Sequence, residues 1–153
     1  MAKAPDFDVA AAHKYFAASC FNRAWDLMEK KDRSPEDDRM MIALNQASLF
    51  HWSQRPDNSD KHRSIGYWQA SRIQALLGNA VEARRYGEVC LSYSGDLDPF
   101  YVGYAFEALA RAARLAGDEA KAAEYLAVAR EKVKAVSRKE DRDLLEADLR
   151  SLG

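Results

Sequence analysis

The chain has 153 residues, of which 48% are hydrophobic and 31% charged, and its formal net charge is -1. This length is typical of one domain, so we expect a single helical domain over residues 1–153. The apolar fraction excludes a disordered chain, and the near-neutral charge argues against whole-chain attraction to nucleic acid or to an anionic membrane.

No apolar run reaches the roughly 18 residues of a transmembrane helix, and the N-terminal residues lack the apolar segment of a secretory signal. We therefore expect a cytoplasmic protein with no membrane partner. The cysteines Cys20 and Cys90 both lie in helical patterns. Two buried, reduced thiols are the expectation, and a disulfide between them is the alternative.

The predicted fold is all-α, because strand patterns are nearly absent and Ala, Leu, Glu, Lys and Arg dominate the chain. Glycines, prolines and polar turns divide it into about seven helices, which form three antiparallel pairs and a final helix. Their predicted ranges are, in chain order, Asp6 or Asp8 to about Lys30, Ser34 to Trp52, Ser64 to Leu77, Ala80 to Tyr93, Phe100 to Ala116, Glu119 to Val136, and Ser137 to about Leu152.

Several helix ends have local signals. Ser34 and Asp98 are good N-caps, and each precedes a proline suited to the first helical position. Ser137 and Glu140 have the spacing of a capping box. The polar residues 54–61 predict a loop between the second and third helices.

Two helix–turn–helix segments, residues 64–93 and 99–136, look like copies of one unit. The first segment turns at Gly78 and the second at Gly117. Equivalent residues of the two segments are therefore separated by the same number of residues as these two glycines. A bulky residue on one helix and small residues on its partner are what a stacked helical array requires. The same shift superposes Tyr67 on Phe106, Ala83 on Ala122, and Cys90 on Ala129.

These segments resemble the tetratricopeptide repeat (TPR), the second more closely than the first. In the second segment the matching residues are Phe106, Leu109, Ala110, Ala113, Gly117, Ala122, Leu126 and Ala129. In the first they are Tyr67, Ala70, Ser71, Ala83 and Cys90, whereas Gln74 and Gly87 stand where the family usually has an aromatic residue. The resemblance implies a TPR-like right-handed array of about three antiparallel helix pairs, with residues 137–152 as a C-terminal capping helix. It bears on the fold more than on the function.

Two short stretches also resemble a group of small bacterial proteins. They are His-Trp-x-x-Arg-Pro, from His51 to Pro56, and Gly-Tyr-Trp-Gln, from Gly66 to Gln69. This second resemblance implies no activity.

In tetratricopeptide repeats the first helix of each pair lines a concave groove, and the resemblance implies the same here. Helical spacing places the candidate residues of each helix on one face. The candidate ligand- or partner-binding groove consists of Trp68, Arg72, Tyr104, Glu107, Arg111 and Arg114. Aromatic walls and guanidinium groups suit a carboxylate, a phosphate or an acidic peptide. The alternative is that the arginines are solvated or paired with Glu82, Glu107 or Glu119.

A secondary anion pocket is predicted from His51, Arg55 and Arg63, which flank the polar loop. The alternative is a histidine that merely ends a helix beside a core tryptophan. The sequence has no nucleophile motif, phosphate loop or dinucleotide fingerprint, and neither Cys-x-x-Cys nor His-Glu-x-x-His. We therefore expect no catalytic residues, no cofactor and no metal site, and so no enzyme.

The leading functional hypothesis is an interaction scaffold that binds a peptide or a partner protein in the groove. The second is a binder of a small anionic ligand in the same groove. An enzyme with His51 or His13 as acid/base is a third hypothesis, and a nucleic-acid reader is disfavoured by the charge. A homodimer through the aromatic residues Trp25, Trp52 and Tyr101 is compatible with all of these.

Overall fold

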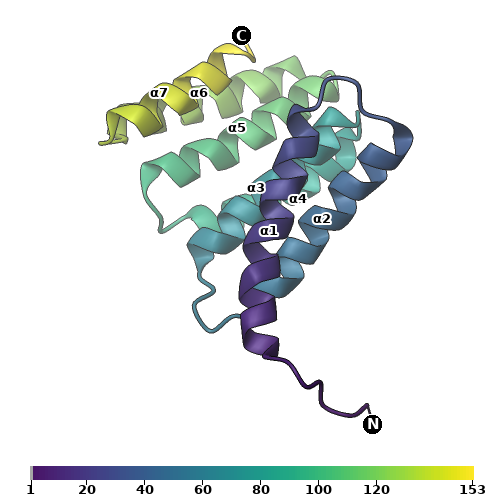
Figure 1. Cartoon of the computed structure of the whole chain (residues 1–153). Helices are drawn as coiled ribbons and strands as arrows, with labels where there is room; N and C mark the ends of the chain where they lie inside the picture. Colours follow the sequence, from purple (N-terminus) through teal and green to yellow (C-terminus); the bar gives the residue numbers. More distant parts are fainter. Residues whose placement is uncertain (1) are drawn as a thin grey trace. The chain divides into compact units, whose positions relative to one another are not determined.

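A computed structural model describes residues 2–153, and within them the chain forms seven α-helices and no strand (Figure 1). Helices hold 78% of the residues, which confirms the predicted all-α class. The helices are α1 (Val9–Glu29), α2 (Pro35–Ser53), α3 (Asp60–Leu76), α4 (Ala80–Ser94), α5 (Pro99–Leu115), α6 (Glu119–Ala135) and α7 (Lys139–Arg150). In the described residues, none of these helices combines the length and the apolar character needed to cross a membrane.

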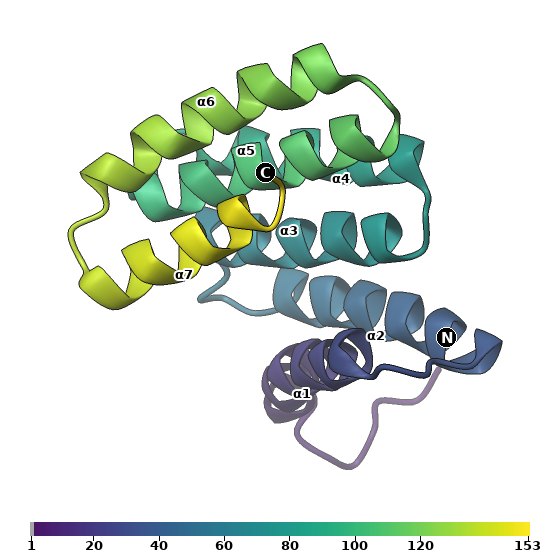
Figure 2. The same cartoon turned by 90° about the horizontal axis from the view of Figure 1, so that it is seen from above.

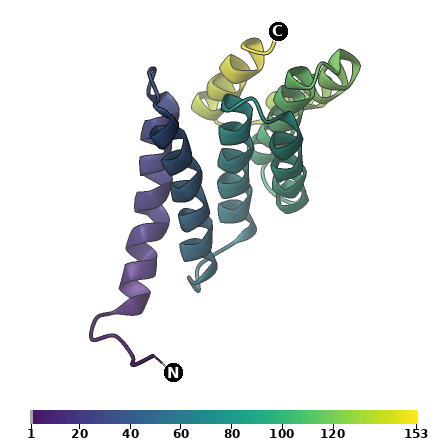
Figure 3. The same cartoon turned by 90° about the vertical axis from the view of Figure 1, so that its right-hand side faces the viewer.

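The chain divides into two compact units, one ending at Ser59 and the other running from Asp60 to Gly153. The N-terminal unit is the pair α1 and α2, which lie side by side (Figure 3). In the C-terminal unit α3 packs on α4, α4 on α5, and α5 on α6, and α7 lies against α5 and α6 (Figure 2).

Small residues bring the two helices of the N-terminal unit together. Ala17 and Ala24 on α1 are fully buried, and Met41 of α2 is buried with them. The hydroxyl of Ser48 donates a hydrogen bond of 2.7 Å to the backbone carbonyl of Ala17. Ser34 caps α2 as predicted.

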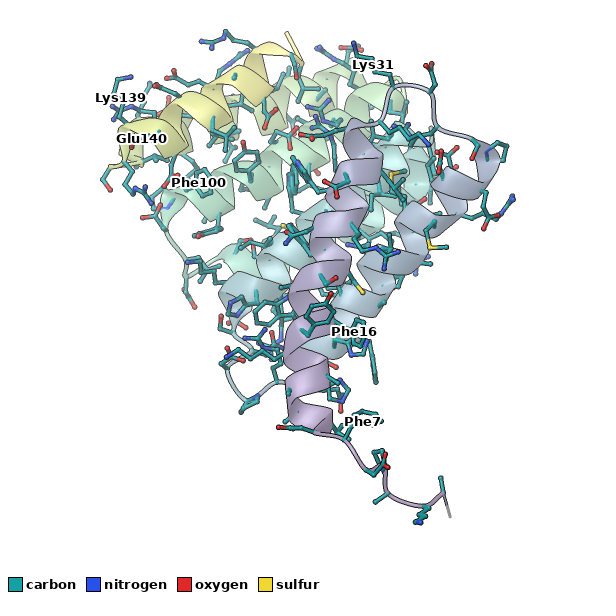
Figure 4. All side chains as sticks on the ribbon, in the orientation of Figure 1. Phe7, Phe16, Lys31, Phe100, Lys139 and Glu140 are labelled. Atoms are coloured by element: carbon teal, nitrogen blue, oxygen red, sulfur yellow. The ribbon has the colours of Figure 1, made fainter. Side chains whose placement is uncertain are left out.

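The N-terminal half of α1 has exposed aromatic side chains. Tyr15 is 65% exposed, Phe16 is 41% exposed, and Phe7, just ahead of the helix, is 63% exposed. Figure 4 labels Phe7 and Phe16. The N-terminal half of α1 is therefore not buried all round, and Ala17, whose carbonyl accepts from Ser48, lies on the side that packs on α2.

The two predicted glycine turns have the same geometry. Gly78 and Gly117 both have φ of 80°, the left-handed conformation that glycine adopts at the end of a helix. In each turn the glycine N–H bonds to the carbonyl three residues back, and the next N–H to the carbonyl five residues back. The donor–acceptor pairs are Gly78 to Ala75, Asn79 to Gln74, Gly117 to Arg114 and Asp118 to Ala113, at 2.9–3.1 Å.

The core of the C-terminal unit depends on close approaches at glycine. A Cβ atom on Gly87 of α4 would lie 3.0 Å from Leu109 of α5, and one on Gly103 of α5 would lie 2.6 Å from Leu145 of α7. Leu145 is fully buried in an apolar cluster that α5, α6 and α7 share. The buried members of that cluster are Ala110, Leu126, Ala129, Val133, Leu145, Leu149 and Leu152.

Two predicted boundaries are wrong. Helix α3 begins at Asp60, inside the predicted loop, because Asp60 pairs with Arg63 one turn later and its carboxylate favours a helix N-terminus. Helix α7 begins at Lys139, so Ser137 does not open a capping box; Arg138 is the N-cap and makes no side-chain cap bond. Val136 is buried after the end of α6, and the chain needs the next two residues to turn before α7.

The glycine contact between α5 and α7 gives a stability prediction. We expect Gly103→Ala to lower the free energy of unfolding by about 1–3 kcal/mol, because the added methyl group must displace Leu145 from a filled core. Gly95→Ala is the matched control, since a Cβ atom there meets nothing within 4 Å and the backbone is already helical. It should be neutral or stabilising by about 0.5–1 kcal/mol. Urea unfolding followed by circular dichroism measures both, and equal midpoints for the two variants would contradict the prediction.

Candidate functional site

The centre of the candidate site is Glu107, a fully buried carboxylate on α5. Its Oε2 accepts a 3.0 Å hydrogen bond from the indole Nε1 of Trp68. Its Oε1 accepts bonds from Nη1 of Arg72 at 3.0 Å and from Nε of Arg111 at 2.8 Å, and Nη2 of Arg111 is 2.7 Å away. We call Trp68, Arg72, Glu107 and Arg111 the Glu107 cluster.

Helical spacing explains why these four side chains converge. Trp68 and Arg72 are one turn apart on α3, and Glu107 and Arg111 are one turn apart on α5, so each pair shares a face. The shift that carries Gly78 onto Gly117 also carries Arg72 onto Arg111. The same position in two successive helix–turn–helix segments therefore supplies a guanidinium group to one carboxylate.

The cluster carries more positive than negative charge. Two guanidinium groups face one carboxylate, and their side chains are 22% exposed for Arg72 and 20% for Arg111. In the described part of the chain, Arg72 makes its hydrogen bond through Nη1, which leaves Nε and Nη2 able to donate to another group. The arrangement is suited chemically to holding an anion at the surface of the cluster.

Tyr104 extends the site from α5 to α7. Its ring meets Trp68 edge to face at a centroid distance of 5.4 Å, and its hydroxyl donates a 2.7 Å hydrogen bond to Asp148. Burial and the bond to the Asp148 carboxylate raise the pKa of Tyr104 far above its ordinary value, so it remains a donor at any physiological pH. Arg111 also reaches α7, where Nη2 donates to the hydroxyl of Ser151 at 3.2 Å.

The structure thus brings together five of the six predicted groove residues. The exception is Arg114, which pairs with Glu119 at 3.4 Å and is 40% exposed. Glu107 is a buried acceptor rather than a residue lining an open groove, and the predicted alternative of arginines paired with Glu107 or Glu119 holds for all three arginines. Sequence reasoning missed Asp148 and Ser151, because no motif marks them and only the packing of α7 brings them to the site.

The residues of the predicted secondary anion pocket each have other partners. Arg55 holds Asp57 through two hydrogen bonds of 2.8 and 2.6 Å, and its guanidinium carbon lies 3.8 Å from the ring centroid of Trp52. Arg63, which belongs to the C-terminal unit, pairs with Asp60 at 3.0 Å. The two arginines of the predicted pocket are therefore neutralised within their own units, and the anion pocket stays a prediction.

His51 of α2 instead contacts His13 of α1. Their Nδ1 atoms lie 2.8 Å apart, so one imidazole donates and the other accepts, and at least one of them must be neutral. Burial, and then the charge of His13, lower the pKa of His51. In the described residues, no group of three or more His, Cys, Asp and Glu side chains is arranged to hold a metal ion.

Both cysteines are buried free thiols, Cys20 in the N-terminal unit and Cys90 in the C-terminal unit, as expected from their helical patterns. Burial raises the pKa of Cys90 to about 11, which leaves it protonated and unreactive. Its Sγ donates to the backbone carbonyl of Ser64 at 3.3 Å.

The aromatic residues suggested for a homodimer are divided between the units. Trp25 and Trp52 lie in the N-terminal unit and Tyr101 in the C-terminal unit, and that dimer stays a prediction.

Comparison of the chain with protein-family models, with curated proteins and with solved structures found no match in any of the three.

The burial of Glu107 gives a second stability prediction. We expect Glu107→Ala to lower the free energy of unfolding by about 3 kcal/mol, because two guanidinium groups and an indole N–H lose their acceptor in a partly buried site. Glu107→Gln keeps an acceptor and should cost less. The control is Glu131→Gln, which breaks an exposed pair with Lys134 and should change stability by less than about 1 kcal/mol. Urea unfolding compares the three, and a Glu107→Ala variant as stable as the control would show that the cluster does not hold α3 to α5.

The histidine pair gives a pH prediction for the N-terminal unit. Since the pKa of His51 is lowered in the folded chain, the unfolded chain binds more protons below the ordinary imidazole pKa of about 6.5. The stability that the pair contributes is therefore present above that pH and is lost as the pH falls through the folded pKa. An NMR titration of the His51 ring measures this directly. His13→Gln removes the charge of His13 but keeps a polar neighbour, so it should move the His51 pKa part of the way back towards its ordinary value. A wild-type pKa at or above that value would contradict the prediction.

Proposed function

We propose that the C-terminal unit is a recognition module, built as a TPR-like helical array, whose Glu107 cluster binds an acidic group on a partner peptide or protein. The observation that carries the proposal is the sharing of one buried carboxylate between Arg72 and Arg111. This arrangement holds two guanidinium groups in place and leaves one net positive charge at a partly exposed surface.

Three features support the array. The turns at Gly78 and Gly117 have the same φ and the same hydrogen bonds. The shift between these turns also relates Arg72 to Arg111. In this proposal α3–α4 and α5–α6 are two successive pairs, α7 is the capping helix, and α1–α2 is the remaining pair of a right-handed array. The capping helix of such an array closes its apolar end, and the full burial of Leu145 of α7 supports this role.

The chemistry of the cluster favours an acidic ligand. A guanidinium group positioned by a buried carboxylate loses less side-chain freedom on binding than a mobile surface arginine. A larger share of the free energy of each new hydrogen bond therefore contributes to affinity. Arg72 has Nε and Nη2 to offer, and a carboxylate or a phosphate can accept from both. Trp68 and Tyr104, which meet edge to face, provide apolar area next to those donors.

A small anionic ligand is the second candidate. It is favoured by the limited exposure of both guanidinium groups, which gives room for one acidic group rather than for a long charged surface. In either case the proposal places the chain in the cytoplasm, and the two free, buried thiols support a reducing compartment.

We expect Arg72→Gln to weaken binding of an acidic partner about tenfold, the equivalent of about 1.4 kcal/mol for one charge-assisted interaction. The substitution leaves Glu107 bonded to Arg111 and Trp68, so the helices stay together. Affinity capture from a lysate with wild type and variant, followed by titration of the captured protein, measures the effect. The matched control is Arg85→Gln, which removes an exposed arginine from its pair with Glu82 on α4.

A partner retained by wild type and by Arg85→Gln but lost by Arg72→Gln supports the proposal. Equal binding by all three proteins would remove the Glu107 cluster from recognition. If the wild type captures no partner, its melting temperature is measured with small dicarboxylates and with inorganic phosphate. A rise for wild type but not for Arg72→Gln would favour the small anionic ligand.

A further inference from the structure

A cleft of about 370 Å³ lies between α6 and α7, and no residue of the Glu107 cluster lines it. Its volume falls in the range of roughly 300–1,000 Å³ that is usual for small-molecule sites. Six residues line it, three from each helix: Arg130, Val133 and Lys134 of α6, and Glu146, Leu149 and Arg150 of α7.

The cleft lies where the packing of α7 on α6 differs from the packing of α5 on α4. Helix α5 approaches α4 closely where Leu109 lies over Gly87. The shift between the two glycine turns puts Leu126 of α6 at the position of Gly87 and Asp148 of α7 at the position of Leu109. A leucine replaces the glycine, and Asp148 turns to the hydroxyl of Tyr104 on α5 instead. Helix α7 thus makes a polar bond to α5 where α5 makes an apolar contact with α4, and the cleft lies on the α6 side of α7.

The floor of the cleft is apolar and its walls are basic. Val133 and Leu149 are 5% and 3% exposed and belong to the apolar core cluster. The three basic lining residues are exposed, against a single lining carboxylate, Glu146. In the described part of the chain, no salt bridge involves Arg130 or Arg150, and Lys134 is held only by an exposed pair with Glu131.

We propose that this cleft binds an organic anion with an apolar body, of the class of fatty or aromatic carboxylates and sulfonates. The body rests on Val133 and Leu149, where it leaves water, and the acidic head lies between Arg130 and Arg150. Two guanidinium groups on opposite walls give the head several donors in forked geometry. The site shares no residue with the Glu107 cluster, and it stands whether or not that cluster binds a partner.

Two fluorescent probes of nearly the same shape test the proposal: anilinonaphthalene sulfonate, which is an anion, and phenylnaphthylamine, which lacks the sulfonate. Wild type should bind the sulfonate more tightly than the amine. The double variant Arg130→Gln/Arg150→Gln should weaken sulfonate binding about tenfold and leave the amine unchanged. The control Lys121→Gln/Arg138→Gln makes the same change of charge at exposed residues outside the cleft and should bind both probes as wild type does.

Glu146→Gln tests the same site in the opposite direction. Removing the one acidic wall residue should tighten sulfonate binding about two- to fivefold and leave amine binding unchanged. All substitutions lie at side chains outside the buried core, and circular dichroism checks that each variant folds. Probe bound by the exposed aromatic residues of α1, such as Tyr15 and Phe16, is common to every variant and cancels in the comparison.

Three results would overturn the proposal. One is a wild type that binds the amine as tightly as the sulfonate. Another is a double variant that retains wild-type sulfonate affinity. The third is an equal loss in the Lys121→Gln/Arg138→Gln control, which would assign the effect to general charge rather than to the cleft.

Discussion

The buried carboxylate of Glu107 is the constraint on which the C-terminal unit depends. A charge taken out of water is costly unless hydrogen bonds and an opposite charge replace its hydration, and here the indole of Trp68 and two guanidinium groups do so. Those donors come from α3 and α5. The register between the two helices must therefore bring all of them to the two carboxylate oxygens of Glu107. Arg111 also donates a hydrogen bond to Ser151 at the end of α7, so α7 is held by the same group of side chains. One buried carboxylate thus relates three helices, in addition to the apolar contacts that α5 and α7 share.

Features that follow from a few neighbouring residues were predictable from the sequence. The caps at Ser34 and Asp98 and the turns at Gly78 and Gly117 each rest on local backbone chemistry, and each is present. The boundaries that depend on distant residues were not. The chain turns after α6 because Val136 is buried in the core, and no local pattern shows that burial; the capping-box spacing that follows it was therefore misleading.

The candidate site was predictable as a set of residues but not as an arrangement. Helical periodicity places Trp68 with Arg72 and Glu107 with Arg111, but it does not say how far α3 and α5 rotate towards each other. That rotation makes Glu107 a buried acceptor instead of a groove residue, and it leaves Arg114 outside the site. The cleft between α6 and α7 was beyond prediction for a related reason, because helical periodicity does not show how closely α7 packs on α6.

The burial of one cysteine in each unit has a consequence for how the opening of the chain can be followed. Cys20 and Cys90 are 6% and 0% exposed, and neither is bonded to the other. A thiol reagent can reach Cys90 only when α3 and α4 separate, because Ser64 and Ser94 enclose it, and can reach Cys20 only when the packing that buries this side of α1 opens. The rate at which each thiol is labelled therefore reports the free energy of the opening that exposes it. The chain carries two native reporters of local unfolding, and mass spectrometry of the two labelled peptides would follow the cooperativity of its halves without any engineered label.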